Sequence, residues 1–207
     1  MSARCECGLV YLPDHPPDVR YHRRVHDAWE HGVKIGPLQS DRVVAHRAGI
    51  EVLVVAPDAP RAQRHRARLV GSTANKETHY DFGVYSEYMR HERGYSTHVF
   101  LARETDRAVG VVVTRARGSF SRTTWSDDGT PDDSAARPCD TGDRWTVDFA
   151  WTHRRHRRRG IATLLIRTAA SHFAVHVHDL AWGAPFEPGG EALARQLCPE
   201  VLYLAAD

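Results

Sequence analysis

Residues 145–173 combine a strand pattern, an arginine-rich loop and a helix pattern, and this order constrains the fold more than any other part of the chain. The strand pattern predicts that one face carries Trp145, Val147, Phe149 and Trp151. Apolar residues then recur at helical spacing from Ile161 to Phe173. The residues between them, 153–160, contain five arginines and end at Gly160. The segment therefore predicts a strand joined to a helix by a short basic loop.

The start of that helix is a candidate anion site. Backbone N–H groups in the first turn of a helix lack partners, and the positive end of the helix dipole lies at the same place. An alternative is that the arginines form a nucleic-acid patch or a solvated turn. We do not expect nucleic acid as the main partner, because no aromatic residues alternate with these arginines. In addition, 28 basic residues nearly balance 26 acidic ones over the chain.

The N-terminus carries a set of metal-ligand types. Cys5 and Cys7 are followed by a Pro-rich turn and then by His22 and His26, which lie four residues apart and so share one helical face. Two thiolates and two imidazoles suit tetrahedral zinc. The single residue between the cysteines is tighter than the usual finger spacing, and the alternative is a surface helix with two incidental histidines. We predict a zinc-finger-like module over residues 1–32.

The middle of the chain has a mixed α/β pattern. The run 50–55 predicts a strand and 60–70 an amphipathic helix. A second helix is expected around 82–92, and strands over 97–102 and 108–114 are joined by a hairpin turn. The polar stretch 121–142 predicts a mobile insertion. We expect a linker over 33–48 and a larger domain over 49–207.

Several functional classes are not expected. No apolar run approaches the roughly 18 residues of a membrane span, and no secretory signal is readable, so we expect a cytoplasmic protein without membrane contact. Cys198 has no His–Asp set around it that indicates a nucleophile, and we interpret it as a buried thiol.

The residues Arg157–Arg158–Arg159–Gly160–Ile161–Ala162 fit the pattern R-x-x-G-x-A. This pattern resembles the pyrophosphate-binding motif of the GNAT acetyltransferases. The resemblance implies acetyl-CoA as cosubstrate and a GNAT fold, a mixed, mostly antiparallel twisted sheet flanked by helices, here with an N-terminal ββα module. It also implies that the acetyl and pantetheine arm lies along Ala150, Trp151 and Thr152. The residues that would then hold the pyrophosphate are Arg157, Arg158, Arg159, Gly160, Ile161, Ala162 and Thr163.

Nearly the whole chain resembles the acetyltransferases that establish sister-chromatid cohesion, which join a small C2H2 finger to a GNAT domain. The departures from that family fall on chemistry. The segment 183–185 reads Gly-Ala-Pro where the family has Ser-Asp-Pro, Arg167 stands at the family's helix glutamate, and Asp148 stands at its strand serine. Acetylation of a cohesin subunit therefore does not follow from the resemblance.

The expected reaction is direct transfer of an acetyl group to an amine of a protein or a small molecule. Asp148, on the polar face of the predicted strand, is the first candidate for general base, and Glu187 is the second. A water relay is a third possibility. The alternative function is a catalytically degenerate GNAT-fold module that binds acyl-CoA or a protein. The acceptor and the oligomeric state stay open.

Overall fold

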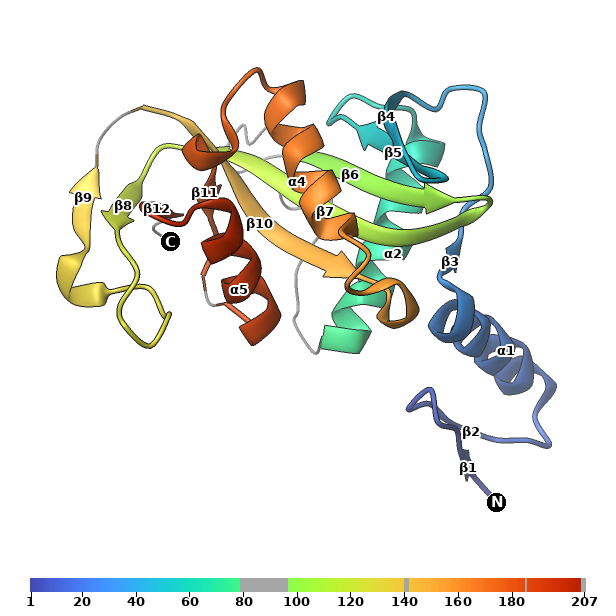
Figure 1. Cartoon of the computed structure of the whole chain (residues 1–207). Coiled ribbons are helices and arrows are strands. Elements are labelled where there is room, and N and C mark those ends of the chain that lie inside the picture. The colour runs from blue at the N-terminus through green and yellow to red at the C-terminus, as the bar shows by residue number, and fades with distance from the viewer. Residues whose placement is uncertain (79–96, 140–141, 185, 206–207) are drawn as a thin grey trace.

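The computed structural model describes residues 1–78, 97–139, 142–184 and 186–205 (Figure 1). The N-terminal module has a ββα order, as predicted: β1 (Ala3–Arg4) pairs with β2 (Val10–Tyr11), and α1 (Pro16–His31) follows. Two prolines in the first turn start this helix, and Gly32 ends it with a φ of 87°.

The rest of the described chain is built around one mixed sheet. In chain order its first strands are β3 (Val33–Lys34), β4 (Val43–Arg47), β5 (Ile50–Val55), β6 (Thr97–Glu104), β7 (Arg107–Arg117) and β8 (Phe120–Thr123). Its last strands are β9 (Arg137–Cys139), β10 (Arg144–Thr152), β11 (Ala181–Trp182) and β12 (Leu202–Ala205). The spatial order is β4-β5-β6-β7-β10-β11-β12-β8-β9, with β3 on β7. Only the β10–β11 and β11–β12 pairs of this described sheet are parallel.

Helices cover both faces of the sheet. Figure 1 shows α4 (Ile161–His172) and α5 (Pro188–Leu197) in front of the sheet and α2 (Arg61–Thr78) behind it. Short helical turns cover Asp133–Ala135, Arg154–His156 and Val177–Asp179. Each face buries its own apolar cluster, one containing Leu165 of α4 and the other Val70 of α2, both fully buried. The predicted mixed, mostly antiparallel sheet flanked by helices is confirmed.

The alternation of β10 is interrupted, so our prediction of one apolar face was wrong. Its register against β7 shifts between Val147 and Phe149, which is a β-bulge at Asp148. Val147 packs in the α4 cluster, whereas Phe149 and Trp151 pack in the α2 cluster. The bulge inserts one residue and so exchanges the two faces in the second half of the strand.

Two segments that we expected outside regular structure contribute to the sheet. The expected linker 33–48 contains β3, which pairs with β7, and β4, which pairs with β5. The expected insertion 121–142 overlaps β8, which pairs with β12, and contains β9. Both join the sheet through partners distant in sequence, which polar composition does not reveal. The helix expected over 82–92 lies outside the described residues.

Candidate functional site

β10 and β11 separate part-way along their length. They pair only at Thr146 and Val147, and the last bond between them runs from the Gly183 N–H to the Val147 carbonyl at 2.9 Å. Beyond this point, no strand in the described part of the chain pairs with β10 on its β11 side. Apart from the Thr152 carbonyl, which accepts from Arg157 Nε, the backbone groups of residues 148–152 on that edge are therefore available to an extended ligand.

The open edge of β10 leads to the start of α4. Gly160 precedes the helix with a φ of 75°, and no side chain caps the helix start. Arg158 also has a positive φ, of 63°. The first helical hydrogen bond joins the Leu164 N–H to the Gly160 carbonyl at 2.9 Å, so the N–H groups of Ile161, Ala162 and Thr163 have no intrahelical partner. This turn provides the predicted anion-binding geometry.

Most arginines of the loop are paired with carboxylates from other elements. Arg157 donates to Glu77 of α2 at 2.8 Å, and Arg159 donates to Glu104 of β6 at 2.8 Å. Glu30 of α1 accepts from both Arg154 and Arg155. The structure gives Arg158 no such partner among the described residues. These carboxylates neutralise much of the positive charge that the sequence suggested for a nucleic-acid patch.

The side chains of the pantetheine-binding candidates point in different directions. Trp151 is 3% exposed, and its indole N–H donates to Glu77 at 2.9 Å. Ala150 packs against the α4 cluster, and the Thr152 carbonyl accepts from Arg157 Nε at 3.2 Å. What these three residues offer to a ligand in common is the backbone of the strand.

Asp148 lies at the bulge, where β10 and β11 part. Its side chain is 1% exposed and lies 3.3 Å from Arg115 and 3.0 Å from Arg117, both on β7. Burial raises the pKa of the Asp148 carboxyl above its ordinary value, and the two arginines oppose that rise. Gly183 leaves room for this group, because a Cβ there would lie 3.3 Å from the Asp148 Cα. A carboxylate with a raised pKa can accept a proton from an amine.

Glu187 lies apart from this buried group. It is exposed and directly precedes α5, without a side-chain hydrogen bond to the helix start. No contact with Asp148 is present among the described residues. It stays the second candidate for general base.

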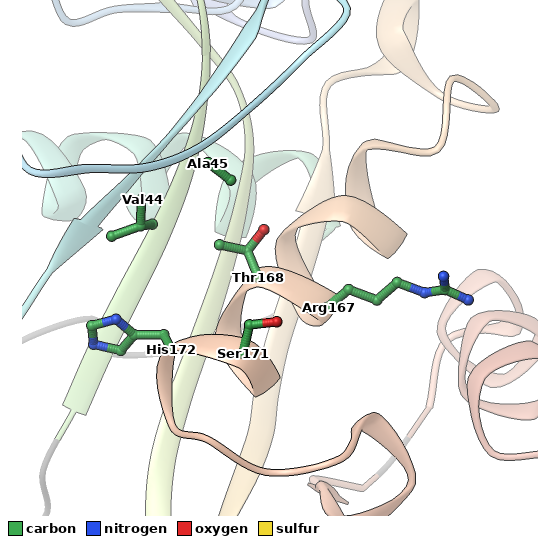
Figure 2. A pocket seen from close by; sticks show the side chains of 6 residues that line it. All are labelled: Val44, Ala45, Arg167, Thr168, Ser171 and His172. Carbon is green, nitrogen blue, oxygen red and sulfur yellow. The ribbon is translucent and has the colours of Figure 1, made fainter.

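Arg167 is one of the residues that line a hollow beside α4. It is exposed on α4 and lines a hollow of about 400 Å³ between α4 and β4, together with Val44, Thr168 and His172. Figure 2 shows its side chain extending away from the β4 residues. The hollow and the β10 edge are therefore separate features.

The four predicted metal ligands come together. One ligand atom from each of Cys5, Cys7, His22 and His26 lies within 4.8 Å of all the others. The Cys5 Sγ lies 3.2 Å from the His26 Nδ1. The Nε2 atom of His22 is buried without a hydrogen-bond partner, which fits a metal ligand.

The C-terminal end of α1 docks on the loop before α4. Arg154 stacks 3.3 Å from the centre of the Trp29 ring, and His153 Nε2 donates to the Trp29 carbonyl at 2.9 Å. Burial lowers the pKa of His153. Asp27 accepts from Arg107 of β7 at 2.5 Å. This docking could not be predicted from the amino-acid pattern, because the partners lie more than a hundred residues from α1 in most of these contacts.

Comparison with known proteins supports the resemblance. Residues 145–204 match the family model described as ESCO1/2 acetyl-transferase. A protein named N-acetyltransferase ESCO2, from Danio rerio, is 24% identical over 96% of this chain. The chain is similar to the ESCO acetyltransferases. It spans about a third (34%) of the length of that relative.

Solved structures of ESCO-type domains share the fold. The xEco2 acetyltransferase domain matches with a TM-score of 0.63 and 16% identity, over 83% of this chain and 99% of that one. The same domain bound to a CoA conjugate matches with a TM-score of 0.64 and 16% identity, over 82% and 99%. This likeness confirms the predicted GNAT-type fold.

Sequence reasoning missed Glu77, Arg115 and Arg117. Glu77 is the one carboxylate in the otherwise basic stretch 61–78, and this contrast was its only signal. Arg115 and Arg117 lie beyond the predicted strand 108–114, in the part of β7 that was not expected, and their approach to Asp148 depends on strand pairing.

Proposed function

We propose that this chain is an acetyl-CoA-dependent N-acetyltransferase that moves an acetyl group directly to an amine of a protein or a small molecule. The main support is the open edge of β10, which is joined by the short loop 153–160 to the uncapped start of α4. An edge of this kind pairs with the amide-containing pantetheine arm, while the helix start takes the pyrophosphate. The relatives named as acetyltransferases support the same function, and one of them is described as bound to a CoA conjugate.

Binding would use mainly backbone groups. The amides of Ile161, Ala162 and Thr163 would donate to the pyrophosphate, with Gly160 at a positive φ where the chain turns. Among the loop arginines, Arg158 would contribute free charge, while Arg157 and Arg159 act from their positions beside Glu77 and Glu104. The backbone of residues 150–152 would hold the thioester at the point of divergence.

For the chemical step, Asp148 would accept a proton from the ammonium form of the acceptor. The neutral amine nitrogen then attacks the thioester carbonyl carbon and the carbon–sulfur bond breaks. The CoA thiolate leaves and takes up the second proton, which the nitrogen loses as it becomes an amide. Unpaired N–H groups on the β10 edge would stabilise the developing oxyanion. The family's aspartate position holds Ala184, which is exposed, so Asp148 would supply the carboxylate from β10 instead.

We propose a structural zinc ion at the N-terminal cluster. Two sulfur and two nitrogen ligands match its preference, and the orphaned His22 Nε2 gains a partner. The metal would link the β1–β2 turn to α1, which otherwise share few buried contacts, since no residue of α1 is fully buried.

Calorimetric titration with acetyl-CoA tests the function, with the wild type beside a Gly160→Asp variant. The variant places a carboxylate at the pyrophosphate site, and we expect it to lose binding. An amine screen with detection of free CoA then tests turnover. Binding without turnover would support the alternative, a degenerate acyl-CoA-binding module, which the exposed Ala184 favours. Absence of binding by folded, zinc-loaded protein would contradict acetyl transfer and acyl-CoA binding, and would leave only the protein-binding form of the alternative.

A further inference from the structure

Glu77 joins two parts of the proposed acetyl-CoA site. Its Oε2 atom accepts from the Trp151 indole at 2.9 Å, and its Oε1 atom accepts from Arg157 Nη2 at 2.8 Å. The Glu77 side chain is 21% exposed, so these bonds are partly shielded from water. One carboxylate on α2 therefore contacts both β10, the proposed pantetheine-binding strand, and the loop 153–160, which precedes the proposed pyrophosphate site.

The hydrogen bonds of Glu77 and Arg157 connect two neighbouring residues at the end of β10, Trp151 and Thr152. Arg157 also donates from Nε to the carbonyl of Thr152, at 3.2 Å. With Nε and Nη2 committed, Nη1 of Arg157 makes no hydrogen bond in the described structure. Glu77 thus fixes the plane of the guanidinium and leaves one of its donor groups free.

Helix stability does not explain the location of Glu77. It lies in the last turn of α2, where the negative end of the helix dipole disfavours a carboxylate. The remaining ionisable residues of this helix are basic, and its last-turn cation is Lys76. A carboxylate beside a site for a polyanion is also unfavourable, because the two negative charges repel each other. Its contacts, rather than the helix, account for its position.

We propose that Glu77 is a positioning residue for acetyl-CoA, which holds Trp151 and Arg157 in the arrangement that the bound cofactor requires. The inference rests on the proposed function. Glu77 does not touch the reacting atoms, so it would affect cofactor binding and leave the chemical step almost unchanged. Its role is to lower the cost of ordering the loop and strand when the cofactor binds.

Glu77→Gln is the direct test, because it replaces one of the two accepting oxygens by an NH2 group, which would then face the donor of either Trp151 or Arg157. We expect KM and Kd for acetyl-CoA to rise by about five- to tenfold. We expect kcat to change by less than about twofold. Glu200→Gln, the same chemical change at an exposed residue outside the site, should leave both constants unchanged.

A double-mutant cycle with Arg157→Gln separates positioning from a general structural effect. If Glu77 acts through Arg157, the double variant should bind acetyl-CoA no more weakly than Arg157→Gln alone. Additive losses, or an unchanged or tighter Kd in folded Glu77→Gln, would overturn the proposal. Thermal unfolding identifies a variant that fails to fold, and Glu77→Asp, which keeps the charge, then replaces it and should bind with intermediate affinity.

Acetyl-CoA binding by the wild type distinguishes a failure of the proposed function from a failure of the proposed role of Glu77. A wild-type chain that does not bind acetyl-CoA contradicts the proposed function. A wild-type chain that binds, beside a Glu77→Gln variant that binds equally well, contradicts only the role of Glu77.

Discussion

At the scale of single residues, Asp148 and Gly183 form a matched pair where β10 and β11 part. The carboxylate is buried against Arg115 and Arg117, and a Cβ on Gly183 would lie 3.5 Å from its Oδ1 atom. The bulge at Asp148 turns the side chain to the face that carries these arginines. The structure therefore places one buried carboxylate at the point of divergence, where the proposed reaction would bring the acceptor amine.

The base role of Asp148 predicts a pH-dependent rate. Asp148→Asn should lower kcat by about 10²- to 10⁴-fold, because the amide cannot accept the proton. Since burial raises the pKa of Asp148, the wild-type kcat should fall as the pH falls through that raised value, where the base becomes protonated. Steady-state kinetics across pH measure this, with the half-exposed Asp179→Asn as control. A folded Asp148→Asn variant with wild-type kcat would assign the base to Glu187 or to water.

At the scale of elements, α4 approaches the sheet closely at its first turn. A Cβ on Gly110 of β7 would lie 2.8 Å from the Ile161 Cγ2 and 3.3 Å from the Leu165 Cδ1. The absence of a side chain at Gly110 sets how close the start of α4, the proposed anion site, lies to the open edge of β10. Packing of the sheet and geometry of the site are linked here.

Gly110→Ala should push α4 away from the sheet. We expect a loss of about 1–3 kcal/mol in the free energy of unfolding, typical of an overpacked core, and weaker acetyl-CoA binding. Urea unfolding and calorimetry measure the two effects. Gly189→Ala is the matched control, since a Cβ there meets nothing within 4 Å. Equal stability of the two variants would show that α4 adjusts without cost.

The metal cluster and α1 give a second prediction at this scale. Metal analysis should find zinc in the wild type and none in Cys7→Ser, because three remaining ligands leave the site incomplete. Loss of zinc should also reduce helical circular dichroism and weaken acetyl-CoA binding, since α1 carries Trp29 and Glu30 against the loop before α4. Cys139→Ser, outside the cluster, should retain the metal. Full zinc content in Cys7→Ser would contradict the assigned ligands.

At the scale of the whole molecule, a buried ion network ties the segment before β4 to the sheet. Asp41 contacts Arg66 of α2 and Arg103 of β6, and each of these side chains is less than a tenth exposed. Arg103 also contacts Glu51 of β5 at 2.6 Å. The network joins three elements and explains why residues 33–48 are part of the domain.

Asp41→Asn should destabilise the fold by about 3–5 kcal/mol, because it leaves the buried guanidinium of Arg66 without its anion and removes one of the two carboxylates that contact Arg103. Burial alone would raise the pKa of Asp41, but the bonds from Arg66, the Leu38 N–H and Arg103 outweigh burial and lower it. The stabilisation is therefore complete above the unfolded pKa of roughly 3.9 and is lost as the pH falls through the lower folded value. Urea unfolding from pH 7 to pH 3 should show this acid loss in the wild type and less of it in the variant. The same dependence of unfolding free energy on pH in the wild type and the variant would contradict this role of Asp41. Asp58→Asn, at an exposed residue, serves as control.

The sequence by itself determined the local features. The uncapped helix start after Gly160 and the four clustered ligands from Cys5 to His26 follow from short-range geometry, because their spacing along a helix or turn fixes where they lie. The same holds for the order of most strands and helices, which hydrophobic periodicity records directly.

Only the tertiary structure decided the features that depend on distant partners. The bulge at Asp148 exchanged the faces of β10, the loop arginines were neutralised by Glu30, Glu77 and Glu104, and residues 121–142 contributed to the sheet. Strand register and ion pairing depend on which segments of the chain lie next to each other in the folded protein. The hydrophobic periodicity of a segment does not specify its distant partners.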